Sequence, residues 1–183
     1  MTEAAQTDRI VAVSNTGPLI SAFQSGRTDL LRRYFSVIYI PASELNELDE
    51  HGWANEIREL INDGLVKVVE LTEQEKELAE HLAKRIAAES RDRDWRNHLP
   101  EAEAMALMEE RKSLAKQILL DEMAARNVAQ ERNLSVTGFP GVVDRAKVDG
   151  LLTPDQARQL LKTCQQQGTH YSDELIETVA RSC

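Results

Sequence analysis

The stretch "IVAVSNTGPLIS", Ile10 to Ser21, joins a short apolar run to a helix-like segment. The run from Ile10 to Ser14 is typical of a buried strand, and Pro18 suits the first turn of a helix, where its missing N–H is not needed. Asn15 and Thr16 therefore occupy a strand-to-helix turn at a sheet edge, where an active-site acid is often found. Because the chain supplies Asn15 there, a site at this turn would lack one carboxylate.

Four further apolar runs predict buried strands, and helical patterns lie between them. Strands that alternate with helices indicate an α/β fold with a mainly parallel central sheet. The third strand carries polar Lys67 and Glu70, which is typical of an edge strand. The four runs are Phe35 to Ile40, Leu65 to Leu71, Gln117 to Leu120 and Leu134 to Gly138.

Cap residues mark the helices between these runs. Ser43 is a possible cap for the helix that follows the second strand, and Gly52 and Gly64 each follow a predicted helix end. Thr72 begins a helix with an acid three residues on, as a capping box requires. After Gly138 the pattern becomes entirely helical.

These patterns predict three parts of the chain. Residues 1–9 form a disordered N-terminal tail, residues 10–152 form the α/β domain, and residues 153–183 form a C-terminal helical extension. Within the domain, Glu89 to His98 is dense in both charges and is predicted to be a mobile loop.

Length and composition narrow the function classes. A chain of 183 residues suits one domain with a buried core. Aromatic residues make up only 4%, which argues against a surface that stacks unpaired bases. The formal charge of -9 does not favour nucleic-acid binding, unless acids gather around a divalent cation that inverts the local charge.

The two cysteines, Cys164 and Cys183, provide no disulfide framework and no metal motif. The N-terminal residues lack the apolar core of a signal peptide, and no apolar run approaches the length of a membrane span. We therefore expect a reduced, cytoplasmic, soluble protein with no membrane partner.

Acids lie where a site is expected, because ligands of open α/β sheets bind beyond the carboxyl ends of the strands. Mg²⁺ and Mn²⁺ take hard oxygen ligands, often one or two carboxylates with waters and a substrate phosphate. The polar residues near predicted strand ends or in the first turns of helices are Ser14, Asn15, Thr16, Glu44, Glu47, Glu101, Glu103, Asp121, Glu122 and Arg126.

Several of these residues also have a structural interpretation. Asn15 and Thr16 could simply form a turn, and Glu101 and Glu103 could stabilise a helix N-terminus. We expect Glu44 to be solvated on a helix face.

The fourth strand end carries two more open alternatives. Asp121 follows three apolar residues and is the strongest metal-ligand candidate, although it could also cap a helix. Arg126 could contact phosphate, although an ion pair with Glu122 is favoured by their spacing of four.

Four segments in order carry a resemblance to a known family: "VSNTGPLIS", "IPASELNEL", "LPEAEAMALMEE" and "ILLDEMAARNVAQERNLSVTGFPGVVDRAKVDGLL". Together they resemble a PIN-like domain, in particular a prokaryotic branch that opens with "SNTSPLI". The resemblance implies a three-layer α/β/α fold and a pocket of acids that bind Mg²⁺ or Mn²⁺ at the strand ends. Many PIN domains are ribonuclease toxins of toxin–antitoxin pairs.

Carried over by position, the resemblance places the first acid of the family at Asn15, where this branch often has the same replacement. The second acid falls on Glu47, and the third on Glu101 or Glu103. The last falls on Asp121, with Glu122 beside it, and Ser14 or Thr16 would supply a small hydroxyl. Pro100 is a second departure, since it stands where the branch has glycine.

These observations predict a Mg²⁺- or Mn²⁺-dependent endoribonuclease, the toxin of a toxin–antitoxin pair. Asp121, Glu47, Glu122 and Glu101 or Glu103 would bind the metal, and Asn15 would orient it or the attacking water. Ser14, Thr16 and Arg126 would bind RNA. The alternative is a catalytically weak PIN-fold module that binds RNA or a protein without cleavage. A phosphatase acting on small phosphoesters is a third hypothesis, and a homodimer is also expected.

Overall fold

The computed structural model describes residues 8–183. The predicted tail, residues 1–9, lies outside the described residues except for Asp8 and Arg9.

A five-stranded sheet in which every neighbouring pair is parallel forms the centre of the molecule, in the order β3-β2-β1-β4-β5. This confirms the predicted α/β fold and places the third strand at an edge. Strands β3 and β5 are shorter than their apolar runs. The strands are β1 (Ile10–Ser14), β2 (Phe35–Pro41), β3 (Val66–Val69), β4 (Gln117–Leu119) and β5 (Val136–Thr137).

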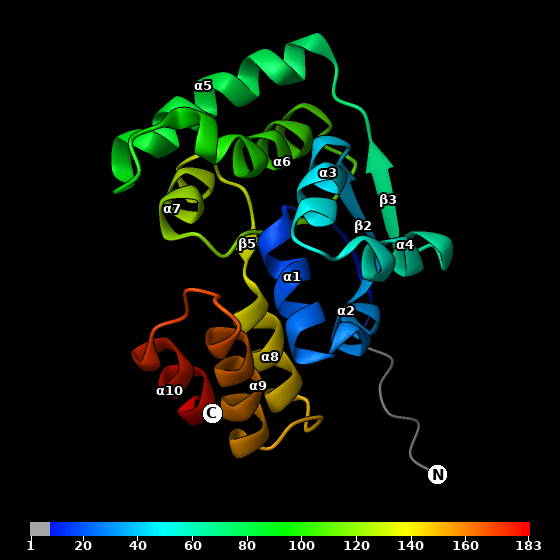
Figure 1. Ribbon diagram of the computed structural model, residues 1–183, viewed down its shortest axis with the longest axis vertical. Coiled ribbons are helices and arrows are strands. Elements are labelled where there is room, and N and C mark those ends of the chain that lie inside the picture. The colour runs from blue at the N-terminus through cyan, green and yellow to red at the C-terminus, as the bar shows by residue number, and fades with distance from the viewer. Residues whose placement is uncertain (1–7) are drawn as a thin grey trace.

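Helices cover both faces of this sheet and make three layers (Figure 1). Side chains of successive strand residues alternate between two cores. Ala12 of β1 packs with one face, on which lie α1 (Thr16–Ser25), α2 (Thr28–Tyr34), α3 (Ser43–Glu50), α4 (Ala54–Asn62), α8 (Phe139–Val148), α9 (Pro154–Gln166) and α10 (Asp173–Arg181). Val13 packs with the other, on which lie α5 (Glu73–Glu89), α6 (Leu99–Glu110) and α7 (Met123–Glu131).

The helix N-caps agree in part with those predicted from the sequence. Thr72 forms the predicted capping box of α5: Glu75 N–H donates to Thr72 Oγ1 at 3.2 Å, and Thr72 N–H donates to Glu75 Oε2 at 3.0 Å. The prediction that Ser43 caps α3 is wrong, because the N-cap is Ala42 and the Ser43 hydroxyl donates to Glu103.

The segment from Glu89 to His98, predicted as a loop, contains a short 3-10 helix, η1 (Trp95–His98). His98 is buried, and its Nε2 lies 2.8 Å from Asp92 O. Helix α6 follows η1 directly, so this segment is anchored beside the first turn of α6.

The two C-terminal helices pack onto α1 and α8 (Figure 1). The apolar faces of α9 and α10 are buried within this chain. Their buried residues are Ala157, Leu160, Leu161, Cys164, Ile176, Val179 and Ala180. These faces therefore give no physical argument for the expected dimer. In the part of the chain that the structure describes, every helix is too short or too polar to cross a bilayer.

Candidate active site at the carboxyl edge of the sheet

Asn15 lies at the N-cap of α1 with extended backbone, and its side chain makes no cap hydrogen bond. Its Nδ2 instead donates to Glu101 Oε1 at 3.3 Å, while its Oδ1 is buried and has no hydrogen-bond partner. The interpretation of Asn15 as a turn former through its side chain is therefore not supported. The side chain joins the end of β1 to the first turn of α6.

Glu101 is one of four glutamates from α3 and α6 that lie within electrostatic range of Glu44 or are Glu44 itself. We call Glu44, Glu47, Glu101 and Glu103 the acid pocket. The charges of the other three glutamates raise the pKa of Glu44, and the charge of Glu47 also raises the pKa of Glu101. The Oε2 of Glu101 and both carboxylate oxygens of Glu44 are buried without a hydrogen-bond partner. Glu103 accepts a hydrogen bond from the Ser43 hydroxyl.

The expectation that Glu44 is solvated is wrong, because the residue is 1% exposed. Glu44 precedes the fully buried Leu48 by four residues, so the two residues share the inward face of α3. The spacing of four from Leu48 indicated that Glu44 is buried, but the prediction gave more weight to the charge of Glu44.

Burial shifts the titration of the acid pocket. Desolvation raises the pKa of Glu101 to about 7, and the charges of Glu122 and Glu47 act in the same direction. Desolvation also raises the pKa of Glu44 well above its ordinary value. Glu101 can therefore change its protonation state near neutral pH.

Asp121 ends the apolar run of β4 and is held by hydrogen bonds at both oxygens. Phe139 N–H, in the first turn of α8, donates to Oδ1 at 2.8 Å, and the Tyr171 hydroxyl donates to Oδ2 at 2.7 Å. Tyr171 also lies 2.8 Å from Ser21 Oγ of α1. Burial raises the pKa of Asp121, although these two hydrogen bonds oppose the shift.

Two glycines leave room around Asp121. A Cβ at Gly138 would lie 2.5 Å from Asp121 Oδ1 and 2.8 Å from Arg126 Nη1, so a side chain cannot be accommodated there without movement. A Cβ at Gly17 would lie 3.8 Å from Asn15 Oδ1 and 4.0 Å from the Asp121 Cβ. Gly17 therefore lies close to both Asn15 and Asp121.

The other predicted site residues, Glu122, Arg126, Ser14 and Thr16, make local contacts or are buried. Glu122 caps α7 by accepting hydrogen bonds from Ala124 and Ala125 N–H, so the cap role considered for Asp121 belongs to Glu122. Arg126 donates to Leu120 O at 3.1 Å, and the predicted ion pair with Glu122 is absent between these described residues. Ser14 and Thr16 are buried, and the Ser14 hydroxyl donates to Asn15 O.

The acid pocket fits a hard divalent cation by its chemistry. Across residues 8–183, no group of three or more acid, histidine or cysteine side chains is arranged as a ready-formed metal site. Four buried oxygens nevertheless lack a hydrogen-bond donor: Asn15 Oδ1, Glu44 Oε1, Glu44 Oε2 and Glu101 Oε2. Carboxylate and amide oxygens are the ligands that Mg²⁺ takes in proteins.

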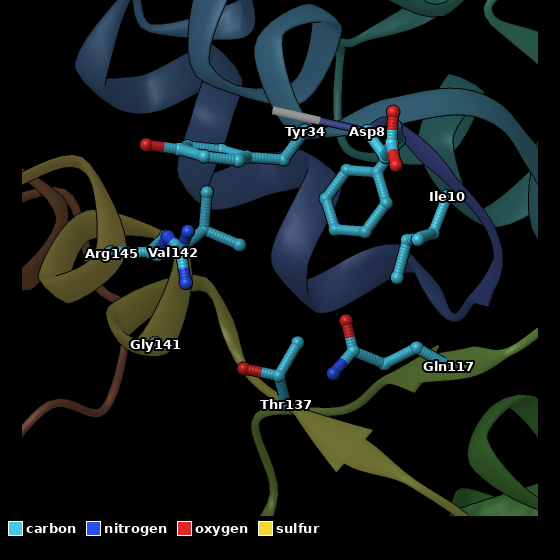
Figure 2. Close-up of a pocket in the computed structure, with 9 residues that line it drawn as sticks. Asp8, Ile10, Tyr34, Gln117, Thr137, Gly141, Val142 and Arg145 are labelled. Atoms are coloured by element: carbon cyan, nitrogen blue, oxygen red, sulfur yellow. The ribbon is translucent and has the colours of Figure 1, made fainter. Parts of the chain in front are cut away.

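Two of the larger cavities of the protein lie outside the acid pocket. One, of about 480 Å³, lies toward the amino ends of β1 and β4 and is lined by Tyr34, Gln117, Thr137 and Arg145, among others (Figure 2). Its described lining includes no residue of the acid pocket. The Tyr34 hydroxyl there donates to Asp149. The other, of about 560 Å³, is bounded by α7, α8 and α10 and includes Asp121, Arg126 and Tyr171.

Sequence reasoning missed the contributions of Glu44, Gly138 and Tyr171 to this site. Gly138 lay in a quoted motif, but the close approach of Asp121 is visible only in three dimensions. Tyr171 comes from the C-terminal extension, 50 residues after Asp121, and no local pattern marks it.

A comparison with protein families identifies the family of this chain. A family model described as a PIN domain matches residues 11–183, which includes the C-terminal helices. Searches among curated proteins and among solved structures gave no match. The match covers nearly the whole chain and is consistent with the three-layer parallel fold, so the chain belongs to the PIN domain family.

Proposed function

We propose that this protein is a Mg²⁺- or Mn²⁺-dependent endoribonuclease and the toxin of a toxin–antitoxin pair. Its family, which is one of nucleases, supports phosphodiester hydrolysis as the reaction class. One structural observation carries the proposal: four buried side-chain oxygens at the carboxyl edge of the sheet lack a donor. Buried polar atoms usually have hydrogen-bond partners, so this concentration of exceptions favours a ligand.

Asn15 and Glu101 would hold the cation, with Glu47 and Glu103 at the margin of the acid pocket. Asp121 lies across Gly17 from Asn15 and would complete the site on that side. Glu122 lies within the electrostatic range of Glu101 but is committed to its helix cap. A bound divalent cation stabilises the negative charge that develops on phosphate during hydrolysis.

The chain itself supplies groups for substrate binding. Arg126 lines the cavity beside Asp121, where its guanidinium is available to an RNA phosphate. The apolar Met123 and Leu175 line the same cavity and offer contacts for a base.

A second candidate function has its own support. Both oxygens of Asp121 already accept hydrogen bonds, and Asn15 brings no charge to the site. These features favour a PIN-fold module that binds RNA or a protein without cleavage. A module of this kind need not bind a divalent cation.

Metal binding and cleavage by the purified protein test the proposal. Mn²⁺ is titrated by calorimetry into metal-stripped wild type, Glu101→Gln and the control Glu110→Gln, whose site is exposed at the end of the same helix. We expect wild type and the control to bind Mn²⁺ and cleave RNA, and Glu101→Gln to lose both properties. Wild type that binds no Mn²⁺ would overturn the nuclease assignment and favour the binding module.

The proposal includes an antitoxin and a homodimer as partners. Light scattering across micromolar concentrations measures the oligomeric state. Co-expression with a neighbouring open reading frame tests for an antitoxin, which should suppress both toxicity and RNA cleavage.

A further inference from the structure

Glu44 is the most deeply buried acid of the site. It is 1% exposed, and neither of its carboxylate oxygens has a hydrogen-bond partner. Structural carboxylates in protein interiors are paired or hydrogen-bonded, because an unpaired buried charge is strongly destabilising. Glu44 therefore has no visible structural reason to be an acid.

Three other acids of the acid pocket lie within electrostatic range of Glu44. Glu47 lies one turn further along its own helix, and Glu101 and Glu103 approach from α6. Glu101 in turn accepts a hydrogen bond from Asn15, and its charge acts on Glu44, so both residues lie near the same carboxylate. Three of the four unpaired oxygens of the site belong to Glu44 and Glu101, and the fourth belongs to Asn15.

We propose that Glu44 is a further ligand of the divalent cation and supplies the carboxylate that Asn15 does not. The inference rests on the proposed function, since it assigns a residue to the same cation site. The unpartnered carboxylate and amide oxygens of Glu44, Glu101 and Asn15 are the hard donors that a divalent cation takes, and its charge would offset the mutual repulsion of the acids. The site would then have as many carboxylates as one with an acid at position 15.

The inference is tested by Mn²⁺ titration of metal-stripped protein, with thermal unfolding as a second readout. The variants are Glu44→Gln, the exposed control Glu50→Gln on the same helix, and Glu44→Gln combined with Asn15→Asp. Glutamine has nearly the same shape as glutamate, and a thermal transition establishes that each variant is folded.

We expect Glu44→Gln to bind Mn²⁺ at least about tenfold more weakly than wild type and to lose most of the Mn²⁺-dependent rise in Tm. Its metal-free Tm should be higher than that of wild type, because a repulsive buried acid has been neutralised. Asn15→Asp should restore Mn²⁺ affinity in the Glu44→Gln background, since the carboxylate returns on the other side of Glu101. Glu50→Gln should behave as wild type.

The outcomes separate this inference from the proposed function. If Glu44→Gln binds Mn²⁺ as wild type does, Glu44 is not a ligand, and the nuclease proposal stands. If Glu44→Gln weakens binding but Asn15→Asp does not restore it, the exchange of carboxylates between positions 15 and 44 is refuted. If wild type binds no Mn²⁺, both proposals fail.

Discussion

The hydroxyl of Tyr171 donates a hydrogen bond to Asp121 Oδ2 at 2.7 Å, and this contact ties the C-terminal helices to the end of β4. Asp121 lies at a strand end, where the motifs place the last acid of the site, whereas Tyr171 lies in the segment between α9 and α10. The predicted extension over residues 153–183 therefore supplies a residue that orients a candidate catalytic acid. The family match extends over the same helices.

Replacement of Tyr171 by phenylalanine should destabilise the protein and loosen the site. The change leaves Asp121 Oδ2 without this donor, and a hydrogen bond to a charged group contributes about 1.5–3 kcal/mol. Urea unfolding measures this loss, and Mn²⁺ titration measures the effect on the site. Tyr34→Phe is the matched control, because Tyr34 donates to Asp149 away from the acid pocket. Equal Mn²⁺ affinities in the two variants would show that Tyr171 does not position Asp121 for the cation.

Asp121→Asn should impair both the fold and the reaction. One of the two donors, Phe139 N–H or the Tyr171 hydroxyl, would face an amide nitrogen in place of a carboxylate oxygen. We expect RNA cleavage to fall by at least roughly 10–100-fold, the range seen when groups around a metal site are removed. A single-turnover cleavage assay at saturating Mn²⁺ measures the loss. Unchanged cleavage in a folded Asp121→Asn protein would exclude Asp121 from the site.

Gly138→Ala should be strongly destabilising, whereas Gly17→Ala should be tolerated. The new Cβ at position 138 would meet Asp121 Oδ1 at 2.5 Å, and overpacking of this kind costs about 1–3 kcal/mol. A Cβ at position 17 makes only ordinary contacts, and alanine within a helix is about 0.5–1 kcal/mol more stable than glycine. Urea unfolding of both variants provides the comparison. A stable Gly138→Ala protein would mean that Asp121 moves freely in this region.

The strands could be predicted because each is a local apolar pattern. The first strand, Ile10–Ser14, has the bounds that its apolar run predicts, since it lies at the centre of the sheet and pairs on both sides. The strands at the two edges pair on one side only, and both end earlier than their apolar runs. Hydrophobic patterns report burial, whereas strand length also depends on available partners.

The candidate site could be predicted only in part. The strand ends and helix starts placed Asn15, Glu101 and Asp121 correctly near one edge, because parallel strands bring their carboxyl ends together. The role of Glu44 depends on which way a helix face turns, and that of Tyr171 on a contact across 50 residues. The burial of Glu44 is indicated by its spacing of four from Leu48, whereas no local spacing indicates the Tyr171 contact.

The titration of Glu101 predicts that this residue favours the folded, metal-free protein most in mild acid. The pKa of Glu101 is about 7 in the folded protein, against an ordinary value of 4.5, so the folded state binds this proton more tightly than the unfolded chain does. The free energy of unfolding should therefore fall as pH rises from 4.5 to about 7, by about 3 kcal/mol for this group. Glu44, Glu103 and Asp121 have raised pKa values and contribute with the same sign.

Urea unfolding of metal-stripped protein at pH 5, 6, 7 and 8 measures this dependence. Glu101→Gln should be less sensitive to pH than wild type and should be the more stable of the two at pH 8, because glutamine cannot ionise. Glu110→Gln should keep the wild-type slope, since that residue is exposed at the far end of α6. Saturating Mn²⁺ should reverse the trend in wild type, because cation binding favours the ionised carboxylates. A Glu101→Gln protein with the wild-type slope would show that the pKa of Glu101 is not raised in the folded, metal-free protein.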